Sequence, residues 1–307
     1  MISVRNLSKQ FGNLRAVDSI SFEVAPGELF GFLGPNGADK TTTISMISGL
    51  VRPDQGTVLI GDLDLWQDPR KAKRLLGLVP QEVAFYEEFN ALENLKFWAS
   101  LYGLPYAEIK KNSAEILERV GLADRAKEPV SRYSGGMKRR LNLAIGLVHR
   151  PSVLLLDEPT VGIDPQARNN ILEIIRDIAR QGTTIIFTTH HLEEAEKLCD
   201  RIAIMDHGKI LQTGSVKELA RVVGDRDVVT LRGSFSAAAM QQCLTEQPVS
   251  IINVADDTAS LYLNDNYRLA ALVAQIDRAG LSLADLSVQK PTLESVFLKL
   301  TGMELRD

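Results

Sequence analysis

Apolar and polar positions in the first two thirds of the chain alternate between strand-like and helix-like patterns. Residues Ser19–Val24 (SISFEV) alternate apolar and polar side chains, which is typical of a half-buried antiparallel strand. Three short runs are instead continuously apolar, namely Leu29–Leu33, Val153–Asp157 and Thr184–Thr189. Such runs are typical of parallel strands covered on both faces. Because helical patterns follow these runs, we predict an α/β layered domain with a parallel core sheet.

Two further stretches have a different pattern. Between roughly Pro80 and Arg150 the chain is mostly helical in pattern, which predicts a helical subdomain, at about residues 82–150, inserted between two strands of the core. After about Val216 the pattern predicts the order β-α-β-β-α-β and then a last helix, an open α+β sandwich of about 80 residues. We therefore predict a core domain over residues 1–220, which includes an antiparallel β subdomain, and a small α+β domain over residues 221–307.

The composition restricts the class of protein but does not indicate a function. The 307 residues carry a net charge of −4, with 45% hydrophobic and 24% charged residues, as in ordinary globular proteins. This balance gives no reason to expect a nucleic-acid partner. We find no signal peptide and no apolar stretch near the ~18–20 residues that span a bilayer, so we expect any work for a membrane to be done from outside it. Cys199 and Cys243 cannot make a disulfide framework, and we predict buried thiols in a reducing compartment.

The segment GPNGADKTT, Gly34–Thr42, lies directly after the run Leu29–Leu33 and directly before a helical pattern. A phosphate-binding loop requires this context, because small residues let consecutive N–H groups point at phosphates beside a helix N-terminus. We expect Lys40 to reach the β- and γ-phosphates, Thr41 to ligate Mg²⁺ and Thr42 to donate to the α-phosphate. Taken alone, the segment could also be a glycine-rich turn between a strand and a helix.

Two more segments carry candidate chemistry. Asp157 and Glu158 end a predicted buried strand, at the edge where open α/β sheets bind ligands. We expect Asp157 to hold Mg²⁺ and Glu158 to orient or deprotonate the attacking water, although a helix-cap Asp would also end a strand. About 20 residues earlier, Tyr133–Arg140 (YSGGMKRR) opens a basic amphipathic helix with a Ser and two glycines, where an anion could bind. By itself this segment could be a simple N-cap.

Together these segments resemble ABC transporter ATPases, whose motifs occur in the same order and spacing over residues 1 to about 215. The resemblance is carried by Gly34–Thr42, Gln81 after LVP, Ser134-Gly135-Gly136, Asp157-Glu158, Gly162–Pro165 (GIDP) and Thr188–His191 (TTHH). Three further stretches are similar to ATPases of drug-resistance exporters, including daunorubicin-resistance-like proteins: Glu93–Leu104, His190–Ile210 and Lys290–Leu305.

The resemblance implies roles for single residues. Phe11 is similar to the aromatic that stacks on adenine, although it could instead be a core or turn aromatic. Gln81 is similar to the residue that senses Mg²⁺ and couples to the membrane subunit. Asp164 is similar to an acid that communicates across a dimer. His190 resembles the histidine that contacts the γ-phosphate, and we expect the flanking His191 to be structural. Glu158, His190 and Gln81 are thus the expected catalytic residues, and Thr41, Gln81 and Asp157 the expected Mg²⁺ ligands. The residues expected to bind nucleotide are Phe11, Gly34, Pro35, Asn36, Gly37, Ala38, Asp39, Lys40, Thr41, Thr42, Ser134, Gly135, Gly136 and Asp164.

The resemblance also implies cofactors and partners. ATP and Mg²⁺ are the expected cofactors. Ser134 and Gly136 would contact the γ-phosphate bound to an opposite subunit, so the expected assembly is a head-to-tail dimer with a second copy or a paralogous subunit. Met137, where the family commonly has Gln, should be tolerated because the Ser and the glycine backbone make the contact. We expect this dimer to serve a separate membrane permease at the cytoplasmic face of the cell membrane.

One residue departs from the phosphate-loop pattern, because Asp39 stands where the second glycine is usual. If the backbone there is left-handed, Asp costs roughly 1–2 kcal/mol. A carboxylate about 5 Å from a phosphate charge is opposed by about 3 kcal/mol at an effective dielectric constant of about 20. Mg²⁺ and Lys40 would offset part of this, or Lys40 would pair with Asp39 instead. We expect a roughly hundredfold loss of nucleotide affinity.

Three functions therefore remain to be separated. The first is an ATPase subunit that powers export through a separate permease. The second is a regulatory subunit with a cassette made inactive by Asp39. The third, a soluble cassette acting on ribosomes or DNA, is disfavoured because this chain has one cassette, no heptad run and no basic patch.

Overall fold

The structure, a computed structural model, describes residues 1–223, 228–245, 247–263, 268–289 and 292–301. The chain divides into two compact units, Met1–Thr213 and Gly214–Asp307, which are described separately. Residues 290–291 and 302–305 of the C-terminal stretch discussed above lie outside the described residues. Over the described ranges, no helix has both the length and the apolar character needed to cross a membrane.

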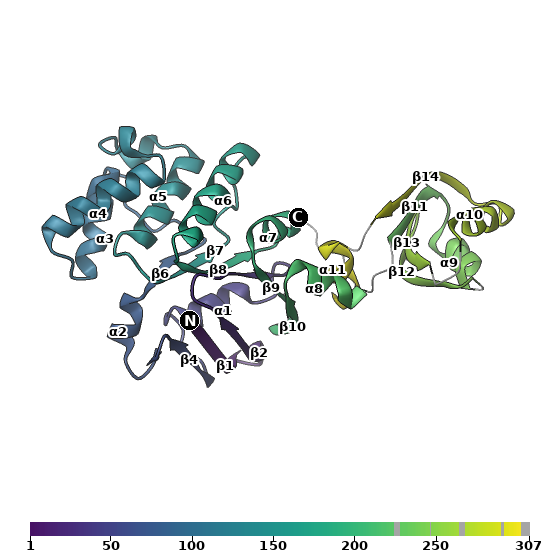
Figure 1. Cartoon of the computed structure of the whole chain (residues 1–307), viewed down its shortest axis with the longest axis horizontal. Coiled ribbons are helices and arrows are strands. Elements are labelled where there is room, and N and C mark those ends of the chain that lie inside the picture. Colours follow the sequence, from purple (N-terminus) through teal and green to yellow (C-terminus); the bar gives the residue numbers. More distant parts are fainter. Residues whose placement is uncertain (224–227, 246, 264–267, 290–291, 302–307) are drawn as a thin grey trace. The chain divides into compact units, whose positions relative to one another are not determined.

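The first unit is built on a six-stranded sheet (Figure 1). In spatial order its strands are β10 (Lys209–Gly214), β9 (Arg201–Asp206), β3 (Leu29–Leu33), β8 (Thr184–Thr189), β7 (Val153–Asp157) and β6 (Leu76–Val79). The pairs from β9 to β6 are parallel. Every residue of β3, β7 and β8 is buried, as the continuously apolar runs predict.

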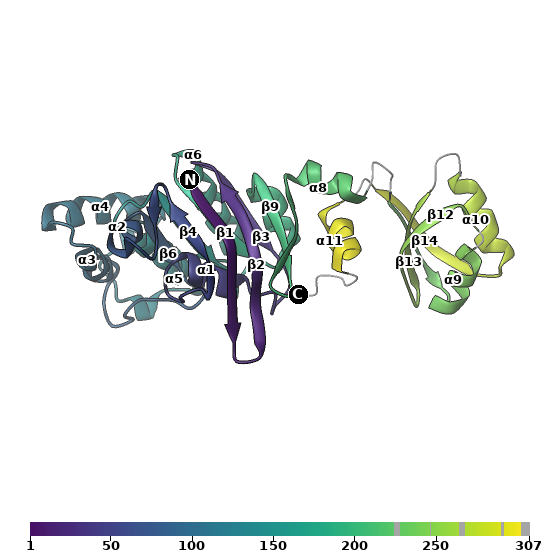
Figure 2. The same ribbon diagram turned by 90° about the horizontal axis from the view of Figure 1, so that it is seen from below.

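A second, four-stranded sheet of the same unit is antiparallel where its pairing is described, and Figure 2 shows its first two strands as one long hairpin. Its strands are, in order, β2 (Leu14–Val24), β1 (Ile2–Phe11), β4 (Gln55–Ile60) and β5 (Leu63–Asp64). The main core lies between the two sheets and includes helix α1 (Lys40–Ile47). Phe22 of β2 stacks on Phe30 of β3 with ring centres 5.4 Å apart, so aromatic packing joins the sheets directly.

The remaining helices of this unit include a group between β6 and β7, which confirms the predicted insertion between two core strands. The group between β6 and β7 consists of α3 (Ala91–Leu101), α4 (Tyr106–Arg119) and α5 (Gly135–Leu147), with 3-10 turns at Ala123–Arg125 and Val130–Arg132. The other helices of the unit besides α1 are α2 (Pro69–Arg74), α6 (Pro165–Arg180) and α7 (Leu192–Leu198). The start of α3 is set by a capping box, in which the Asn90 side chain accepts from the Glu93 N–H and the Glu93 carboxylate accepts from the Asn90 N–H.

The second unit begins with a helix that the sequence pattern does not predict, and from there on it has the predicted order β-α-β-β-α-β followed by a helix. Its elements are α8 (Val216–Val223), β11 (Val228–Ser234), α9 (Ala237–Thr245), β12 (Val249–Ala255), β13 (Thr258–Leu263), α10 (Leu269–Arg278), β14 (Ser282–Gln289) and α11 (Leu293–Thr301). The strands form an antiparallel sheet in the order β12-β13-β11-β14, with α9 and α10 on one face (Figure 1). The prediction of two buried thiols is right for Cys199 and wrong for Cys243, which is only half-buried where it packs against the core of the second unit.

Candidate active site

The predicted phosphate-binding loop joins β3 to α1 and has Asp39 in a backbone conformation suited to glycine. A Cβ atom on Gly34 would lie 2.2 Å from the Met205 carbonyl oxygen, so only glycine fits at the start of the loop. Asp39 is the N-cap of α1 and has φ 67° and ψ 30°, a left-handed conformation. The condition for backbone strain at Asp39 is therefore met, although Asp tolerates this region better than most residues.

The Asp39 side chain engages a residue expected to bind nucleotide. The Thr42 hydroxyl donates to Asp39 Oδ1 over 3.0 Å. The Thr43 hydroxyl donates to the Asp39 carbonyl oxygen, also over 3.0 Å, and so anchors the main chain at this point. Asp39 therefore brings a negative charge to the loop and also takes up the hydroxyl donor that Thr42 would offer a phosphate.

The Lys40 amino group is held inside the site. Its Nζ atom donates to the carbonyl oxygens of Gly34 (2.7 Å) and Pro35 (3.0 Å) and lies 3.2 Å from Glu158 Oε1. The side chain is only 4% exposed, and this burial lowers the pKa of Lys40 while the Glu158 charge opposes the shift. Lys40 thus pairs with Glu158, and the alternative pairing with Asp39 is not formed.

Thr188 connects the two acidic residues that follow β7. Its hydroxyl donates to Asp157 Oδ1 over 2.7 Å and accepts from the Glu158 N–H over 2.9 Å. Burial raises the pKa of Asp157, against the opposing effect of hydrogen bonds from Thr188 and Thr41. No role for Thr188 is predicted from the sequence, although a hydroxyl residue at the carboxyl end of the neighbouring parallel strand is a usable signal.

Glu158 lies between two basic side chains. Its Oε2 atom is 3.2 Å from His190 Nδ1, while Oε1 faces Lys40. Burial opposes ionisation, but the hydrogen bond with His190 and the charge of Lys40 outweigh it and hold the pKa of Glu158 below its usual value. Its backbone φ of 44° is a left-handed value for a residue with a side chain, a kind of strain that is concentrated at functional sites.

Thr41 and Asp157 are the two groups that could hold a magnesium ion. The Thr41 hydroxyl hydrogen-bonds to the buried Asp157 carboxylate, which places two hard oxygen donors side by side. In the described ranges there is no group of three or more His, Cys, Asp or Glu side chains able to bind a metal. Mg²⁺ usually takes only one or two protein carboxylates and is completed by phosphates and water, so this pair fits it.

A second set of expected residues lies at the starts of two helices. The Ser134 side chain caps α5 by accepting from the Met137 N–H over 3.3 Å. Asp164 caps α6 by accepting from the N–H groups of Gln166 and Ala167, each over 3.0 Å. In the part of the chain that the structure describes, the hydrogen bonds of both side chains stay within their own helix starts.

Two more predicted residues lie apart from the buried acids. Gln81 follows β6 and is exposed, and its carbonyl oxygen accepts from Arg139 of α5. Phe11 ends β1 with 49% of its surface exposed, and the Lys9 amino group lies 5.4 Å from its ring centre. The contacts of the described residues thus unite one group of the predicted side chains, namely Lys40, Thr41, Asp157, Glu158 and His190.

Comparison with known proteins identifies this arrangement. Over 311 residues, and with both chains completely covered, the chain is 43% identical to the linearmycin resistance ATP-binding protein LnrL of Bacillus subtilis (strain 168). The chain belongs to the ABC transporter ATP-binding proteins. The ABC transporter family matches residues 17–161, which include the phosphate loop and both acids. The daunorubicin resistance ATP-binding protein DrrA3 of Streptomyces coeruleorubidus is 38% identical, with 99% of this chain and 97% of that protein covered.

Solved ABC structures have the same fold. The ATP-binding subunit of an ABC transporter aligns with a TM-score of 0.66 and 30% identity over 73% of this chain and 93% of that one. A dimeric ATP-binding cassette in a post-hydrolysis state, bound to ADP and Pi, aligns with a TM-score of 0.64 over 70% of this chain and 98% of that one. At 24% identity, the second likeness concerns the fold alone. The predicted fold class, the resemblance to drug-resistance ATPases and the assignment as an ABC-type ATPase are confirmed.

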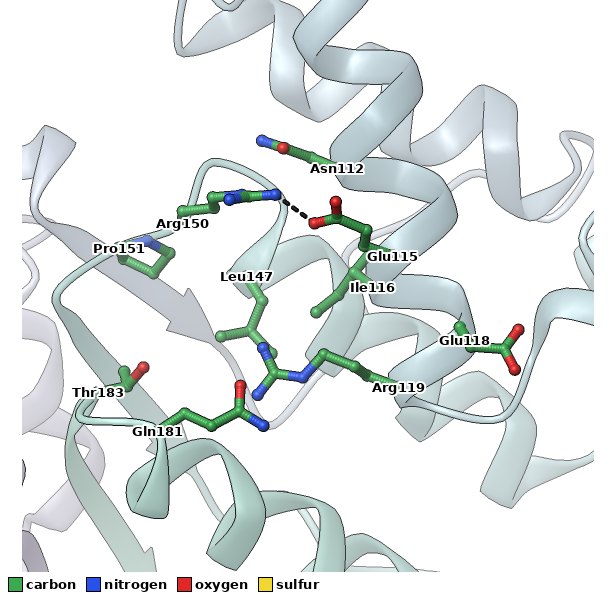
Figure 3. A pocket seen from close by; sticks show the side chains of 10 residues that line it. All are labelled: Asn112, Glu115, Ile116, Glu118, Arg119, Leu147, Arg150, Pro151, Gln181 and Thr183. Atoms are coloured by element: carbon green, nitrogen blue, oxygen red, sulfur yellow. Dashed lines mark hydrogen bonds and ion pairs between the residues drawn. The ribbon is translucent and has the colours of Figure 1, made fainter.

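A separate cavity of about 580 Å³ lies at the opposite ends of the core strands from the candidate site (Figure 3). Pro151 and Thr183 line it just before β7 and β8 begin, whereas Asp157 lies where β7 ends. Arg119 of α4 points into it, and Arg150 pairs with Glu115 at its rim. None of the predicted nucleotide-binding residues lines this cavity.

Proposed function

We propose that this chain is the ATP-hydrolysing subunit of an ABC-type exporter. Glu158 carries the proposal, because it is a buried carboxylate kept ionised between Lys40 and His190. An ionised carboxylate at this edge of the sheet can orient a water molecule and accept its proton as the water attacks the γ-phosphate. Phosphates would compete with Glu158 for Lys40, which would free one carboxylate oxygen for the water.

Thr41 and Asp157 are proposed to hold Mg²⁺. Their oxygens adjoin each other, and the buried carboxylate matches the hard ligands that this ion prefers. When bound, Mg²⁺ would supply positive charge to the phosphate oxygens. Gln81 is exposed at the end of β6 and is proposed to complete the site in the nucleotide-bound state.

A complete site is proposed to need two chains. The first turn of α5, after Ser134, offers helix N–H groups that can bind a phosphate. The hydrogen bonds of Ser134 remain within its own helix. The phosphate that binds at this helix start is therefore proposed to belong to a nucleotide held by a second copy or a paralogous subunit, packed head to tail.

The permease is proposed to bind an aromatic patch made of Tyr86, Phe89 and Phe97. These side chains are 45%, 41% and 36% exposed. The Tyr86 ring lies 5.3 Å from Phe89 and 5.1 Å from Phe97, so the three form one contiguous apolar surface. The patch follows Gln81 closely in the chain, and two relatives are named for resistance to linearmycin and daunorubicin. Export through a separate permease, at the cytoplasmic face of the membrane, is the function that unites these features.

Asp39 is proposed to weaken nucleotide binding about a hundredfold, through charge repulsion and the loss of the Thr42 donor. Isothermal titration of Mg²⁺–ATP into the full chain and into an Asp39→Gly variant tests this, and the variant should bind about a hundredfold more tightly. Equal affinities would contradict the role given to Asp39.

Hydrolysis is tested in the same Asp39→Gly chain. Glu158→Gln added to this variant should keep ATP binding and remove turnover, because the amide cannot accept a proton from water. If the Asp39→Gly chain fails to hydrolyse ATP even with its permease, the ATPase proposal is wrong.

A second candidate, a regulatory subunit that dimerises without efficient turnover, is favoured by the Asp39–Thr42 hydrogen bond. Robust ATP hydrolysis by the unaltered chain in the assembled transporter would eliminate it. ATP-dependent transport that persists only because a partner subunit hydrolyses ATP would support it.

A further inference from the structure

The segment from Pro80 to Glu87, which contains Gln81 and is called the Gln81 segment below, is held by a buried amide side chain. Asn142 of α5 is 1% exposed. Its Nδ2 atom donates to the Pro80 carbonyl oxygen over 3.0 Å, and its Oδ1 atom accepts from the Ala84 N–H over 3.2 Å. One side chain thus fixes the main chain on both sides of Gln81, and its burial makes the loss of either hydrogen bond costly.

Arg139, one turn earlier on α5, makes a second connection. Its guanidinium donates to the Gln81 carbonyl oxygen and, over 2.9 Å, to the carbonyl oxygen of Val161. Val161 lies three residues before Asp164, the cap of α6. Arg139 therefore joins the Gln81 segment to the loop that leads into α6.

The far end of the Gln81 segment is held as well. Asn94 of α3 is fully buried; it accepts from the Tyr86 N–H over 2.8 Å and donates to the Tyr86 carbonyl oxygen over 2.9 Å. Lys138 of α5 pairs with Glu87 at 2.5 Å. Side chains of two helices therefore hold a segment that is neither helix nor strand, and the Ser131 N–H adds a main-chain hydrogen bond to the Glu87 carbonyl oxygen over 2.9 Å.

We infer that Asn142 and Arg139 are positioning residues that hold the Gln81 segment against α5, so that the segment and the helix move together as a rigid body. Ser134 begins the same helix, eight residues before Asn142, which is about 12 Å at the rise of an α-helix. A displacement of the Gln81 segment therefore moves Ser134 with it. Given the proposed function, this couples Gln81 of one chain to the nucleotide held against Ser134 of the same chain.

The coupling is tested first without nucleotide, by amide hydrogen exchange of the full chain. Asn142→Leu keeps the size of the side chain and removes both hydrogen bonds, so the Ala84 amide should exchange about tenfold faster. Asn112→Leu is the matched control, because Asn112 is a buried amide of α4 that donates to the Val148 carbonyl oxygen and, among the described residues, has no hydrogen bond to the Gln81 segment. Unchanged exchange at Ala84 in Asn142→Leu, or an equal increase in the control, would overturn the inference.

The second test measures ATP turnover in the Asp39→Gly background. Arg139→Ala and Asn142→Leu should each lower kcat about tenfold and leave KM for ATP within about twofold, because they displace Gln81 and leave the phosphate loop intact. Asn142→Asp keeps the acceptor for Ala84 and should recover part of the rate. Arg139 is half-exposed, so its variant keeps the test valid if Asn142→Leu does not fold.

The outcomes separate the two proposals. An Asp39→Gly parent that never hydrolyses ATP contradicts the proposed function, whereas the exchange experiment still decides whether Asn142 holds the segment. A parent that is active and variants with an unchanged kcat would overturn the positioning role alone.

Discussion

At the scale of the residue, Asp39 combines two effects that can be separated by chemistry. Its left-handed backbone is a conformational cost that Asp bears better than most residues. Its carboxylate adds a negative charge beside the expected phosphates and accepts from Thr42. The charge should weigh more, because Coulomb repulsion at this range is larger than the residual backbone strain.

An Asp39→Asn variant isolates the charge. Asparagine tolerates the left-handed region and can still accept from the Thr42 hydroxyl, so only the charge is lost. We expect the Asp39→Asn variant to recover more than half of the roughly hundredfold affinity that Asp39→Gly recovers, measured on a logarithmic scale by Mg²⁺–ATP titration. An affinity no better than that of the unaltered chain would mean that the side-chain volume or the Thr42 contact dominates.

At the scale of the element, the C-terminal end of α5 is held against the core sheet. A Cβ atom on Gly77 of β6 would lie 2.1 Å from the Gly146 carbonyl oxygen, so strand and helix approach at glycine distance. Beyond the helix, His149 Nε2 lies 2.8 Å from the Leu76 carbonyl oxygen, and the imidazole stacks on Tyr102 with ring centres 3.6 Å apart. The helix that begins at Ser134 is therefore tied to the core sheet at its other end.

His149 makes this attachment sensitive to pH. Burial lowers the pKa of His149, and the hydrogen bond with Leu76 opposes the shift only in part. An unfolded chain binds the proton near pH 6.5, whereas the folded chain resists it to lower pH. Stability is therefore retained above about pH 6.5 and declines as the pH falls from there towards the lower pKa of the folded state.

Replacing His149 by Phe should keep the stack on Tyr102 and remove this pH dependence. We expect a smaller fall in the thermal midpoint between pH 7.5 and 5.5, together with a loss of about 1 kcal/mol at pH 7.5 from the missing hydrogen bond. His207→Asn serves as the control, since the side chain of His207 is 86% exposed. An identical pH dependence in His149→Phe and the unaltered chain would contradict the prediction.

At the scale of the whole molecule, the proposed head-to-tail pair makes defects in different chains complementary. In the Asp39→Gly background, a Lys40→Ala chain lacks a phosphate loop and a Ser134→Arg chain lacks a usable α5 start. A mixed pair has one doubly defective site and one intact site. Mixing the two should restore turnover to at most about a quarter of the parent rate, because half of the pairs are mixed and each has one good site. No recovery, with mixed pairs demonstrated by differential tags, would contradict the arrangement.

Much of this structure could be predicted from the sequence because its signals are local. The apolar run Val153–Asp157 marks a buried strand, and the acids at its end mark the ligand edge. Contacts that depend on tertiary geometry could not be predicted in this way. Thr188 joins Asp157 to Glu158 only because β7 and β8 pair in one register, and Asn142 reaches Pro80 across 62 residues of sequence. The half-buried position of Cys243 depends likewise on how α9 packs.

The capped start of α5 is intact in this chain, while the loop that would receive ATP carries Asp39. If the proposed function holds, such a chain would bind ATP weakly in its own loop and would still offer a working α5 start to the nucleotide of a partner chain. Paired with itself it would make two weak sites, but paired with a paralogue whose loop has glycine it would make one weak site and one strong site. Such a pair would be asymmetric, because the strong site would bind and hydrolyse ATP before the weak site. In a cell that holds both kinds of chain, the ratio of their expression would then set how many transporters have two equivalent ATP sites and how many have a single strong site.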